Sequence, residues 1–211
     1  MRKYIFLIFI SVLWYNCYSY QQSLIKNTGT STINILFIGN SLTYYNDLPK
    51  LVKKYANNKG IKVKTEMIAY PNYAIMDHWN DGKAQKLISS NNYDYVIIQQ
   101  GPSSQREGRK VLIEYGKRFN SLCKKNNSKL CYYMVWPSMN YYYTFDDVIK
   151  NHTNAASINN AILLPVGEIW KTHFDKTNNF DYYNSDGFHP SLKGSKKAAE
   201  IIVESLLNNN L

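Results

Sequence analysis

Short apolar runs alternate with segments of helical periodicity along most of the chain. Runs typical of buried strands cover residues 33–38, 61–69, 95–99, 130–136 and 161–164. Apolar residues at helical spacing predict helices over 47–58, 78–90, 104–124, 145–157, 166–174 and 192–207. Five buried strands separated by helices indicate an α/β protein with a parallel sheet and helices on both of its faces.

In a sheet of this kind, ligands bind beyond the carboxyl ends of the strands. Residues 39–41, 99–101 and 136–137 follow, or end, three of the predicted strands. The pattern therefore places these three segments on one rim of the sheet and predicts that a functional site lies there.

The amino terminus has the pattern of an export signal. Arg2 and Lys3 give a basic start, residues 4–14 form an apolar run, and residues 17–19 offer a small-x-small cleavage site. The apolar run is shorter than the roughly 20 residues of a membrane-spanning helix. We therefore expect a signal peptide over 1–19, a flexible polar lead-in over 20–32 and one domain over 33–211. The mature protein is then periplasmic or secreted and has no membrane span.

Cys17 offers an alternative to cleavage and release, which is attachment of a lipid to its thiol. Tyr15 and Asn16 precede it, and they match poorly the small residues usual at lipidation sites. This favours the signal peptide over the lipoprotein anchor.

Composition narrows the function classes. The chain has 211 residues, 45% of them hydrophobic and 19% charged, which suits one globular domain. The net charge is +10, but the lysines are scattered and no basic run carries interleaved aromatics, so nucleic-acid binding is not expected. A solvated basic surface is the simplest interpretation, and weak attraction to anionic glycans is the alternative.

The cysteines do not indicate a metal site, because no CxxC motif or Cys/His cluster is present. Cys123 and Cys131 remain after removal of the leader. An exported protein can join them in a disulfide, and two buried thiols are the equal alternative.

Ser41 is the first candidate for chemistry. It directly follows the first predicted strand, where Gly39 permits a sharp turn and the start of the next helix favours negative charge. A serine exposed on such a turn can act as a nucleophile. The alternative is a serine that merely caps the turn.

Asp186 and His189 form the second candidate. A carboxylate three residues before a histidine, on the loop that leads into the last helix, can accept the Nδ1 proton and leave Nε2 facing a nucleophile. Alternatively, the two residues organise the helix start together with Ser191. The pattern becomes strong when it is combined with Ser41.

The segments Gly-Asn-Ser-Leu at 39–42 and Asp-Gly-Phe-His-Pro at 186–190 resemble the first and last motif blocks of the SGNH (GDSL-like) hydrolases. The resemblance runs from residue 33 to about 207. It implies a flavodoxin-like three-layer α/β/α fold with a five-stranded parallel sheet, a Ser41 nucleophile, an Asp186–His189 pair and no cofactor. Asn40 replaces the Asp of the family motif, at a position that is not the nucleophile.

The middle motif blocks match less well. The family supplies one oxyanion donor from a glycine N–H after the second strand and another from an asparagine side chain after the third. Here residues 69–74 contain no glycine, and Ser103 stands where the asparagine is expected. We predict an oxyanion hole from the N–H groups of Ser41 and Asn72, with Tyr73 or Ala74 as alternatives. The amide of Gln100 is narrowly preferred to that of Gln99 as the third donor, and Ser103 is the next choice.

Further substrate contacts are predicted at Gln99, Ser103, Trp136 and His78. His78 can instead cap or pack at a helix start, and Trp136 can belong to the core. The tyrosines at 141–143 and 182–183 suggest an exposed aromatic surface for carbohydrate, with the tyrosine-rich composition as the alternative explanation.

Together these features predict an exported serine esterase that hydrolyses short-chain esters, acetyl esters above all, on a carbohydrate. The competing hypotheses are a non-catalytic glycan-binding protein on the same scaffold and an acyltransferase that uses the same three residues.

Overall fold

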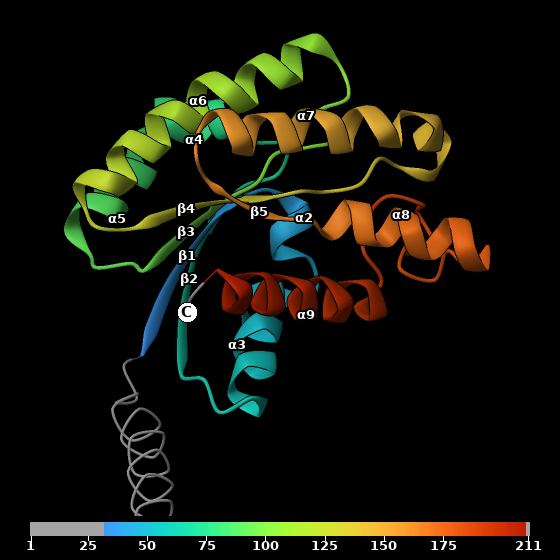
Figure 1. Cartoon of the computed structure of the whole chain (residues 1–211), viewed down its shortest axis with the longest axis horizontal. Coiled ribbons are helices and arrows are strands. Elements are labelled where there is room, and N and C mark those ends of the chain that lie inside the picture. Colours follow the sequence, from blue (N-terminus) through green and yellow to red (C-terminus); the bar gives the residue numbers. More distant parts are fainter. Residues whose placement is uncertain (1–31, 210–211) are drawn as a thin grey trace, which may run out of the picture. The chain divides into compact units, whose positions relative to one another are not determined.

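Five parallel strands form a single sheet in the order β2-β1-β3-β4-β5 (Figure 1). The strands are β1 (Ile33–Gly39), β2 (Val63–Ala69), β3 (Tyr95–Ile98), β4 (Lys129–Tyr133) and β5 (Ile162–Leu164). The computed structural model describes residues 32–209. The predicted signal peptide over 1–19, with Cys17, and the lead-in up to residue 31 lie outside the described residues.

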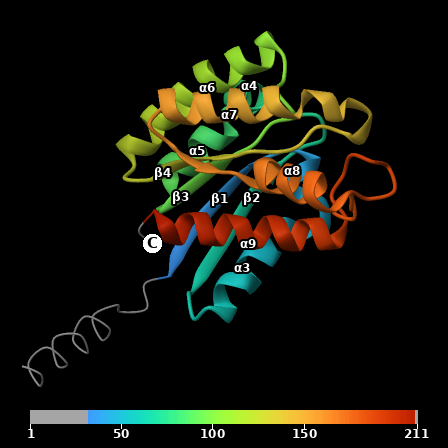
Figure 2. The same cartoon turned by 45° about the vertical axis from the view of Figure 1, so that its right-hand side comes forward.

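Helices cover both faces of the sheet, as Figures 1 and 2 show. One face carries α3 (Leu48–Asn58), α8 (Val166–Thr177) and α9 (Leu192–Asn208). The other carries α4 (Ile75–Asp81), α5 (Lys83–Ser90), α6 (Arg106–Lys125) and α7 (Phe145–Ile158). Short helices α2 (Ser41–Tyr44), η1 (Tyr45–Asp47) and η2 (Met139–Thr144) lie in the connections. The predicted three-layer α/β/α fold is therefore confirmed.

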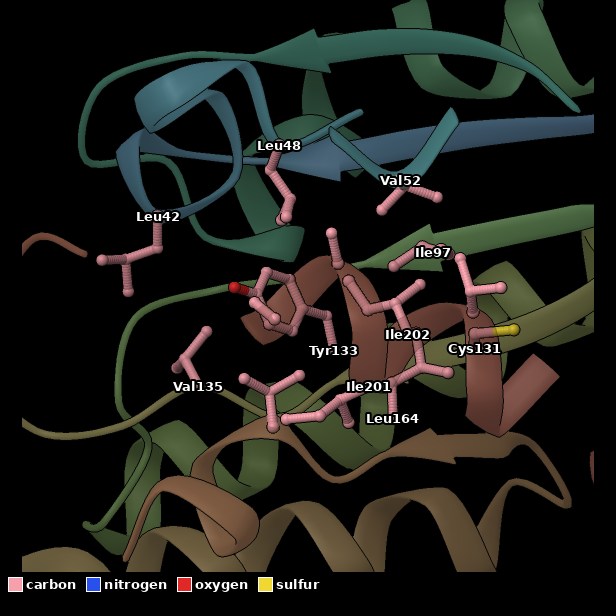
Figure 3. Packing of buried hydrophobic residues seen from close by; sticks show 14 of the residues in the cluster. Leu42, Leu48, Val52, Ile97, Cys131, Tyr133, Val135, Leu164, Ile201 and Ile202 are labelled. Atoms are coloured by element: carbon pink, nitrogen blue, oxygen red, sulfur yellow. The ribbon is translucent and has the colours of Figure 1, made fainter. Parts of the chain in front are cut away.

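Successive residues of β1 explain why the sheet needs both helical layers. Ile35 and Phe37 pack toward α3 and α9, whereas Leu36 and Ile38 pack toward α4 and α6. All four are at most 1% exposed, as expected for a parallel strand that is buried on both faces. Figure 3 shows the first layer, in which side chains of α3 and α9 meet those of β3 and β4.

Two of the differences from the sequence prediction have an identifiable cause. The helix predicted over 78–90 begins at Ile75 and is divided into α4 and α5, because Gly82 adopts φ +75 and its N–H bonds to the carbonyl of Trp79. The strand predicted over 130–136 ends at Tyr133. Its neighbour β3 ends at Ile98, opposite Tyr132, so the next residues run past the end of the shared ladder.

Cys123 and Cys131 are buried free thiols, so of the two alternatives the thiols are confirmed and the disulfide is wrong. Cys123 packs in the layer of α4 and α6, whereas Cys131 faces α3 and α9 across the sheet. Burial raises the pKa of both thiols. Among residues 32–209, no helix combines the length and apolarity needed to cross a bilayer.

The close packing of α6 against β4 at Gly116 yields a stability prediction. A Cβ at Gly116 would overlap the Tyr132 hydroxyl, which donates to the Leu112 carbonyl and accepts from the Asn159 amide. Alanine is favoured over glycine in a helix by about 1 kcal/mol, but the clash breaks this buried network. We expect Gly116→Ala to lower the free energy of unfolding by about 1–3 kcal/mol in urea denaturation.

Gly101→Ala is the matched control, because a Cβ at this position would meet no other atom within 4 Å and the φ of Gly101 is not positive. A Gly116→Ala protein as stable as the wild type would contradict the packing described here.

Candidate active site

The structure brings the three predicted catalytic residues together at the carboxyl ends of the strands. Ser41 follows β1 as the first residue of α2, and Asp186 and His189 lie in the loop before α9. His189 Nε2 lies 3.0 Å from Ser41 Oγ, and His189 Nδ1 lies 2.6 Å from Asp186 Oδ2. A hydrogen-bonded chain from hydroxyl to imidazole to carboxylate thus joins residues 148 positions apart in the sequence.

The loop that carries His189 is fixed by its own backbone. Asp186 Oδ1 accepts hydrogen bonds from the N–H groups of Phe188 and His189, each at 2.9 Å. The N–H of Asn184 donates to the carbonyl of His189 at 2.8 Å, and Gly187 makes the turn with φ +67. The loop therefore places the carboxylate and the imidazole in a set orientation before α9 begins.

Two aromatic side chains support the histidine: Tyr45, which sequence analysis missed, and Trp136, for which it predicted a substrate contact or a place in the core. The ring of Tyr45 stacks on the His189 imidazole with the centroids 4.6 Å apart. Trp136 donates from Nε1 to the carbonyl of Phe188 at 2.9 Å. Neither contact leaves a local signal in the sequence, because each joins segments that are distant along the chain.

The charge state of Asp186 follows from its surroundings. Burial by itself raises the pKa of this carboxyl, but the N–H of Phe188 and the ring and N–H of His189 outweigh it, so the pKa is lowered. The carboxylate is therefore ionised at neutral pH, and its partner nitrogen Nδ1 carries the proton. This tautomer leaves the lone pair of Nε2 to accept the proton of the Ser41 hydroxyl.

Asn40 shapes the turn that presents Ser41. Its Oδ1 accepts from the N–H of Leu42 at 3.1 Å and caps α2, while its Nδ2 donates to the carbonyl of Tyr73 at 3.0 Å. An aspartate at this position would keep the cap but turn a carboxylate oxygen toward the Tyr73 carbonyl, with no proton to share. The asparagine thus ties the turn after β1 to the segment after β2.

Gln99 holds the same turn from the opposite side. Its Oε1 accepts from the N–H of Asn40 at 2.9 Å and from the hydroxyl of Thr43 at 2.8 Å. A Cβ at Gly39 would lie 2.5 Å from this oxygen and would overlap Thr43 Oγ1, so close packing requires the glycine here. Gln99 is 2% exposed, and its Nε2 has no partner among the described residues. Its observed role is therefore to position the turn.

The preferred assignment of Gln100 as an oxyanion donor needs correction. Gln100 Nε2 donates to Ser103 Oγ at 2.7 Å and to the carbonyl of Gly108 at 3.2 Å, so both amide hydrogens are used within the protein. Ser103 in turn donates to the carbonyl of Gly101 and is 4% exposed. The observed role of both side chains is therefore to stabilise the loop between β3 and α6.

His78 and Trp136 are also corrected as substrate contacts, because each is fully buried. His78 Nε2 donates to the carbonyl of Gly39 at 2.7 Å, and burial lowers the pKa of this imidazole despite that bond. Trp136 stacks on Trp170 with the ring centroids 3.6 Å apart. The packing alternatives for His78 and Trp136 describe these residues better.

The structure leaves two of the predicted backbone donors unpaired. Of the three N–H groups considered after β2, that of Tyr73 donates to the Tyr70 carbonyl and that of Ala74 to Asp77 Oδ2. In the described part of the chain, the N–H groups of Asn72 and Ser41 have no hydrogen-bond partner. These two N–H groups remain available to a ligand.

No group of three or more His, Cys, Asp or Glu side chains within residues 32–209 is arranged to hold a metal ion. The chemistry offered by the rim is that of a hydroxyl, an imidazole and a carboxylate in series, beside free backbone donors.

Comparison with known proteins supports the fold. No family model and no curated protein sequence matches the chain. A proposed SGNH hydrolase from Slackia heliotrinireducens is 21% identical with a TM-score of 0.68, covering 83% of this chain and 100% of its own. The lipase/acylhydrolase from Enterococcus faecalis is 15% identical (TM-score 0.67, 84% and 96% covered). A Clostridium thermocellum family 3 carbohydrate esterase is 15% identical (TM-score 0.66, 85% and 97% covered). The chain is similar to these proteins in architecture and has the three-layer α/β/α fold of the SGNH hydrolases.

Proposed function

We propose that the protein is an exported serine esterase that removes short acyl groups, acetyl above all, from a carbohydrate. The observation that carries the proposal is the hydrogen-bonded chain from Ser41 through His189 to Asp186. A scaffold that merely binds a ligand has no need of an imidazole fixed between a hydroxyl and an ionised carboxylate. This arrangement therefore favours an enzyme over a non-catalytic glycan-binding protein.

The reaction proceeds by two acyl transfers. The Ser41 hydroxyl gives its proton to His189 Nε2 as its oxygen attacks the ester carbonyl carbon. Asp186 stabilises the imidazolium that forms. The imidazolium then protonates the leaving alcohol oxygen, the C–O bond breaks, and the acyl group stays on Ser41. Water repeats the sequence, so that the carboxylic acid leaves and the serine regains its proton.

Backbone N–H groups of Ser41 and Asn72 stabilise the negative charge on the tetrahedral intermediate. Neither is used by the protein itself, and the start of α2 at Ser41 adds a favourable dipole. With Gln100 Nε2 engaged elsewhere, the protein works with two backbone donors. The loss of one donor typically costs about 10²–10³ in rate, so we expect a slow esterase.

Export and a carbohydrate substrate rest on two further observations. The first 19 residues have the pattern of a secretory signal, and a carbohydrate esterase is among the proteins with this fold. An acyltransferase would use the same three residues and pass the acyl group to a sugar in place of water. Product analysis with an added sugar acceptor separates these two reactions.

Removal of the nucleophile tests the proposal directly. We expect Ser41→Ala to lower kcat/KM for an aryl acetate by at least about 10³-fold, because the variant lacks the oxygen that forms the acyl intermediate. Ser121→Ala is the matched control, since that hydroxyl lies on α6 and bonds to the carbonyl of Lys117. Equal activity of the two variants would contradict the proposal.

Exchange of the carboxylate tests the tautomer. In Asp186→Asn, the amide oxygen can still accept from the N–H groups of Phe188 and His189, so the loop is kept. The amide nitrogen then donates to His189 Nδ1, which must accept this hydrogen bond without a proton of its own, so the ring proton moves to Nε2 and this nitrogen cannot act as a base. We expect kcat for the aryl acetate to fall by about 10³–10⁴-fold. The near-ultraviolet circular dichroism should stay unchanged, and full activity of this variant would refute the assigned roles.

Gln99 and Gln100 are distinguished by a paired substitution. Gln99→Leu leaves the buried N–H of Asn40 without its acceptor, and we expect it to cost about 1–3 kcal/mol of stability and to lower kcat by displacing Ser41. Gln100→Leu removes hydrogen bonds in the loop before α6, and we expect it to lower stability but to leave kcat nearly unchanged. Measurement of kcat for both folded variants shows which of the two glutamines the reaction depends on. A larger loss of kcat in Gln100→Leu would restore Gln100 as an oxyanion donor.

A further inference from the structure

A groove of about 630 Å³ lies beside the predicted catalytic loop. Asp186 and Phe188 line it together with η2 and with the segments that follow β3 and β4. Asp186, which lines the groove, bonds to Nδ1 of the His189 ring, whereas Ser41 and His189 are not among the lining residues. The groove therefore adjoins the site without containing the reacting atoms.

Two tyrosines of η2 project into this groove. Tyr141 is 59% exposed and Tyr143 is 79% exposed, and their ring centroids lie 6.3 Å apart. Tyr142 between them points inward, where its ring meets Phe145 and its hydroxyl donates to Asp175 Oδ1 at 2.6 Å. The side chain of Tyr142 anchors the segment, so the rings of Tyr141 and Tyr143 stay exposed to solvent.

The groove is also fixed relative to the catalytic loop. The N–H of Met139, at the start of η2, donates to the carbonyl of Gly187 at 2.8 Å. Gly187 lies directly between Asp186 and Phe188 in the sequence. A ligand that rests on the tyrosines is therefore held at a set distance from the His189 ring.

The polar lining matches an uncharged polyol. Asn140 and Gln105 supply amides, and Ser104 and Ser138 supply hydroxyls. No lysine, arginine or histidine among the described residues lines the groove, although the chain carries a net charge of +10, and the charged group present is the carboxylate of Asp186. A ligand with carboxylates or sulfates would meet a like charge there and no cation.

We propose that this groove is a subsite for a neutral sugar residue that neighbours the acylated residue of an oligosaccharide. A sugar ring has apolar C–H faces, which pack on the rings of Tyr141 and Tyr143, and an edge of hydroxyls, which suits the amides and serines. The inference rests on the proposed esterase activity and adds that the substrate is a chain of at least two sugars without acidic groups at this position.

The test compares substrates of increasing length. The wild type is assayed with an aryl acetate, with acetylated methyl xyloside and glucoside, and with acetylated xylo- and cello-oligosaccharides of up to four sugars. We expect kcat/KM per acetyl group to be about ten-fold higher on the oligosaccharides than on the monosaccharides, through a lower KM. Acetylated oligogalacturonides, which carry a carboxylate on every unit, should show no such gain.

Tyr143→Ala and the double variant Tyr141→Ala/Tyr143→Ala should lose most of the gain with length and keep the wild-type rate on the aryl acetate within about two-fold. Both rings are exposed, so these changes do not disturb the core. Ile158→Ala is the control for loss of an exposed apolar side chain, because Ile158 lies on α7, outside the groove, and is 58% exposed. It should behave as the wild type does on every substrate.

Several outcomes would overturn the subsite. One is a wild type whose kcat/KM does not increase with the length of neutral oligosaccharides. Another is a pair of tyrosine variants that keep this increase. The third is a higher kcat/KM on the oligogalacturonides than on the neutral chains. Tyrosine variants that lose activity equally on the aryl acetate would assign the rings to support of the catalytic loop instead. Absence of hydrolysis of the aryl acetate by the wild type would remove the proposed function itself, and the subsite with it.

Discussion

The candidate active site depends on one hydrogen bond, between Ser41 in the first turn of the domain and His189 in its last loop. Three hydrogen bonds from two side chains hold these distant segments together. Asn46, just after α2, donates to the carbonyl of Pro190 at 2.9 Å and to Ser195 Oγ at 3.0 Å, and Tyr55 of α3 donates to Glu204 of α9 at 2.9 Å. Helices α3 and α9 lie side by side on one face of the sheet (Figures 1 and 2). The position of α9 on the sheet therefore places the preceding loop, with the His189 imidazole, next to the turn after β1.

Three neighbouring segments form hydrogen bonds with the turn after β1, and these bonds restrict which residue types the turn can contain. Gln99 accepts the N–H of Asn40, His78 donates to the carbonyl of Gly39, and Asn40 donates to the carbonyl of Tyr73. These contacts come from the ends of β3 and β2 and from α4, so each neighbouring segment contributes one. Such a framework fixes the Ser41 hydroxyl before a ligand arrives, which is the condition under which a positioned nucleophile is effective.

The same framework consumes side-chain amides that the motif pattern suggests for the oxyanion. Gln99 and Gln100 both point into the protein, one toward the nucleophile turn and the other toward the start of α6. In the described part of the chain, the backbone N–H groups of Ser41 and Asn72 remain unpaired, while the two side-chain amides stabilise the nucleophile turn and the loop before α6. The exposed tyrosines of η2, by contrast, are held out to solvent beside the carboxylate of Asp186.

Hydrophobic periodicity predicts the five strands, their parallel arrangement and most helices, because burial on both faces leaves a continuous apolar run. The end motifs predict which residues meet, since carboxyl ends of parallel strands share one rim. Side-chain direction beyond a strand end carries no such periodicity, which is why the sequence favours Gln100 over Gln99.

The burial of His78 is not evident from the sequence because α4 begins three residues before the predicted helix start, at Ile75. Trp136 has the position of a rim residue in the sequence, but long-range stacking on Trp170 buries it.

The central claim is that the Ser41 hydroxyl is a nucleophile activated by His189, and covalent labelling measures this most directly. The protein is treated at neutral pH with a serine-reactive aryl phosphonate, and the adduct is located by peptide mass spectrometry. We predict one phosphonyl group per chain, on Ser41, and a rate of labelling that falls steeply in His189→Ala. No adduct at Ser41, or labelling that is indifferent to the loss of His189, would contradict the account.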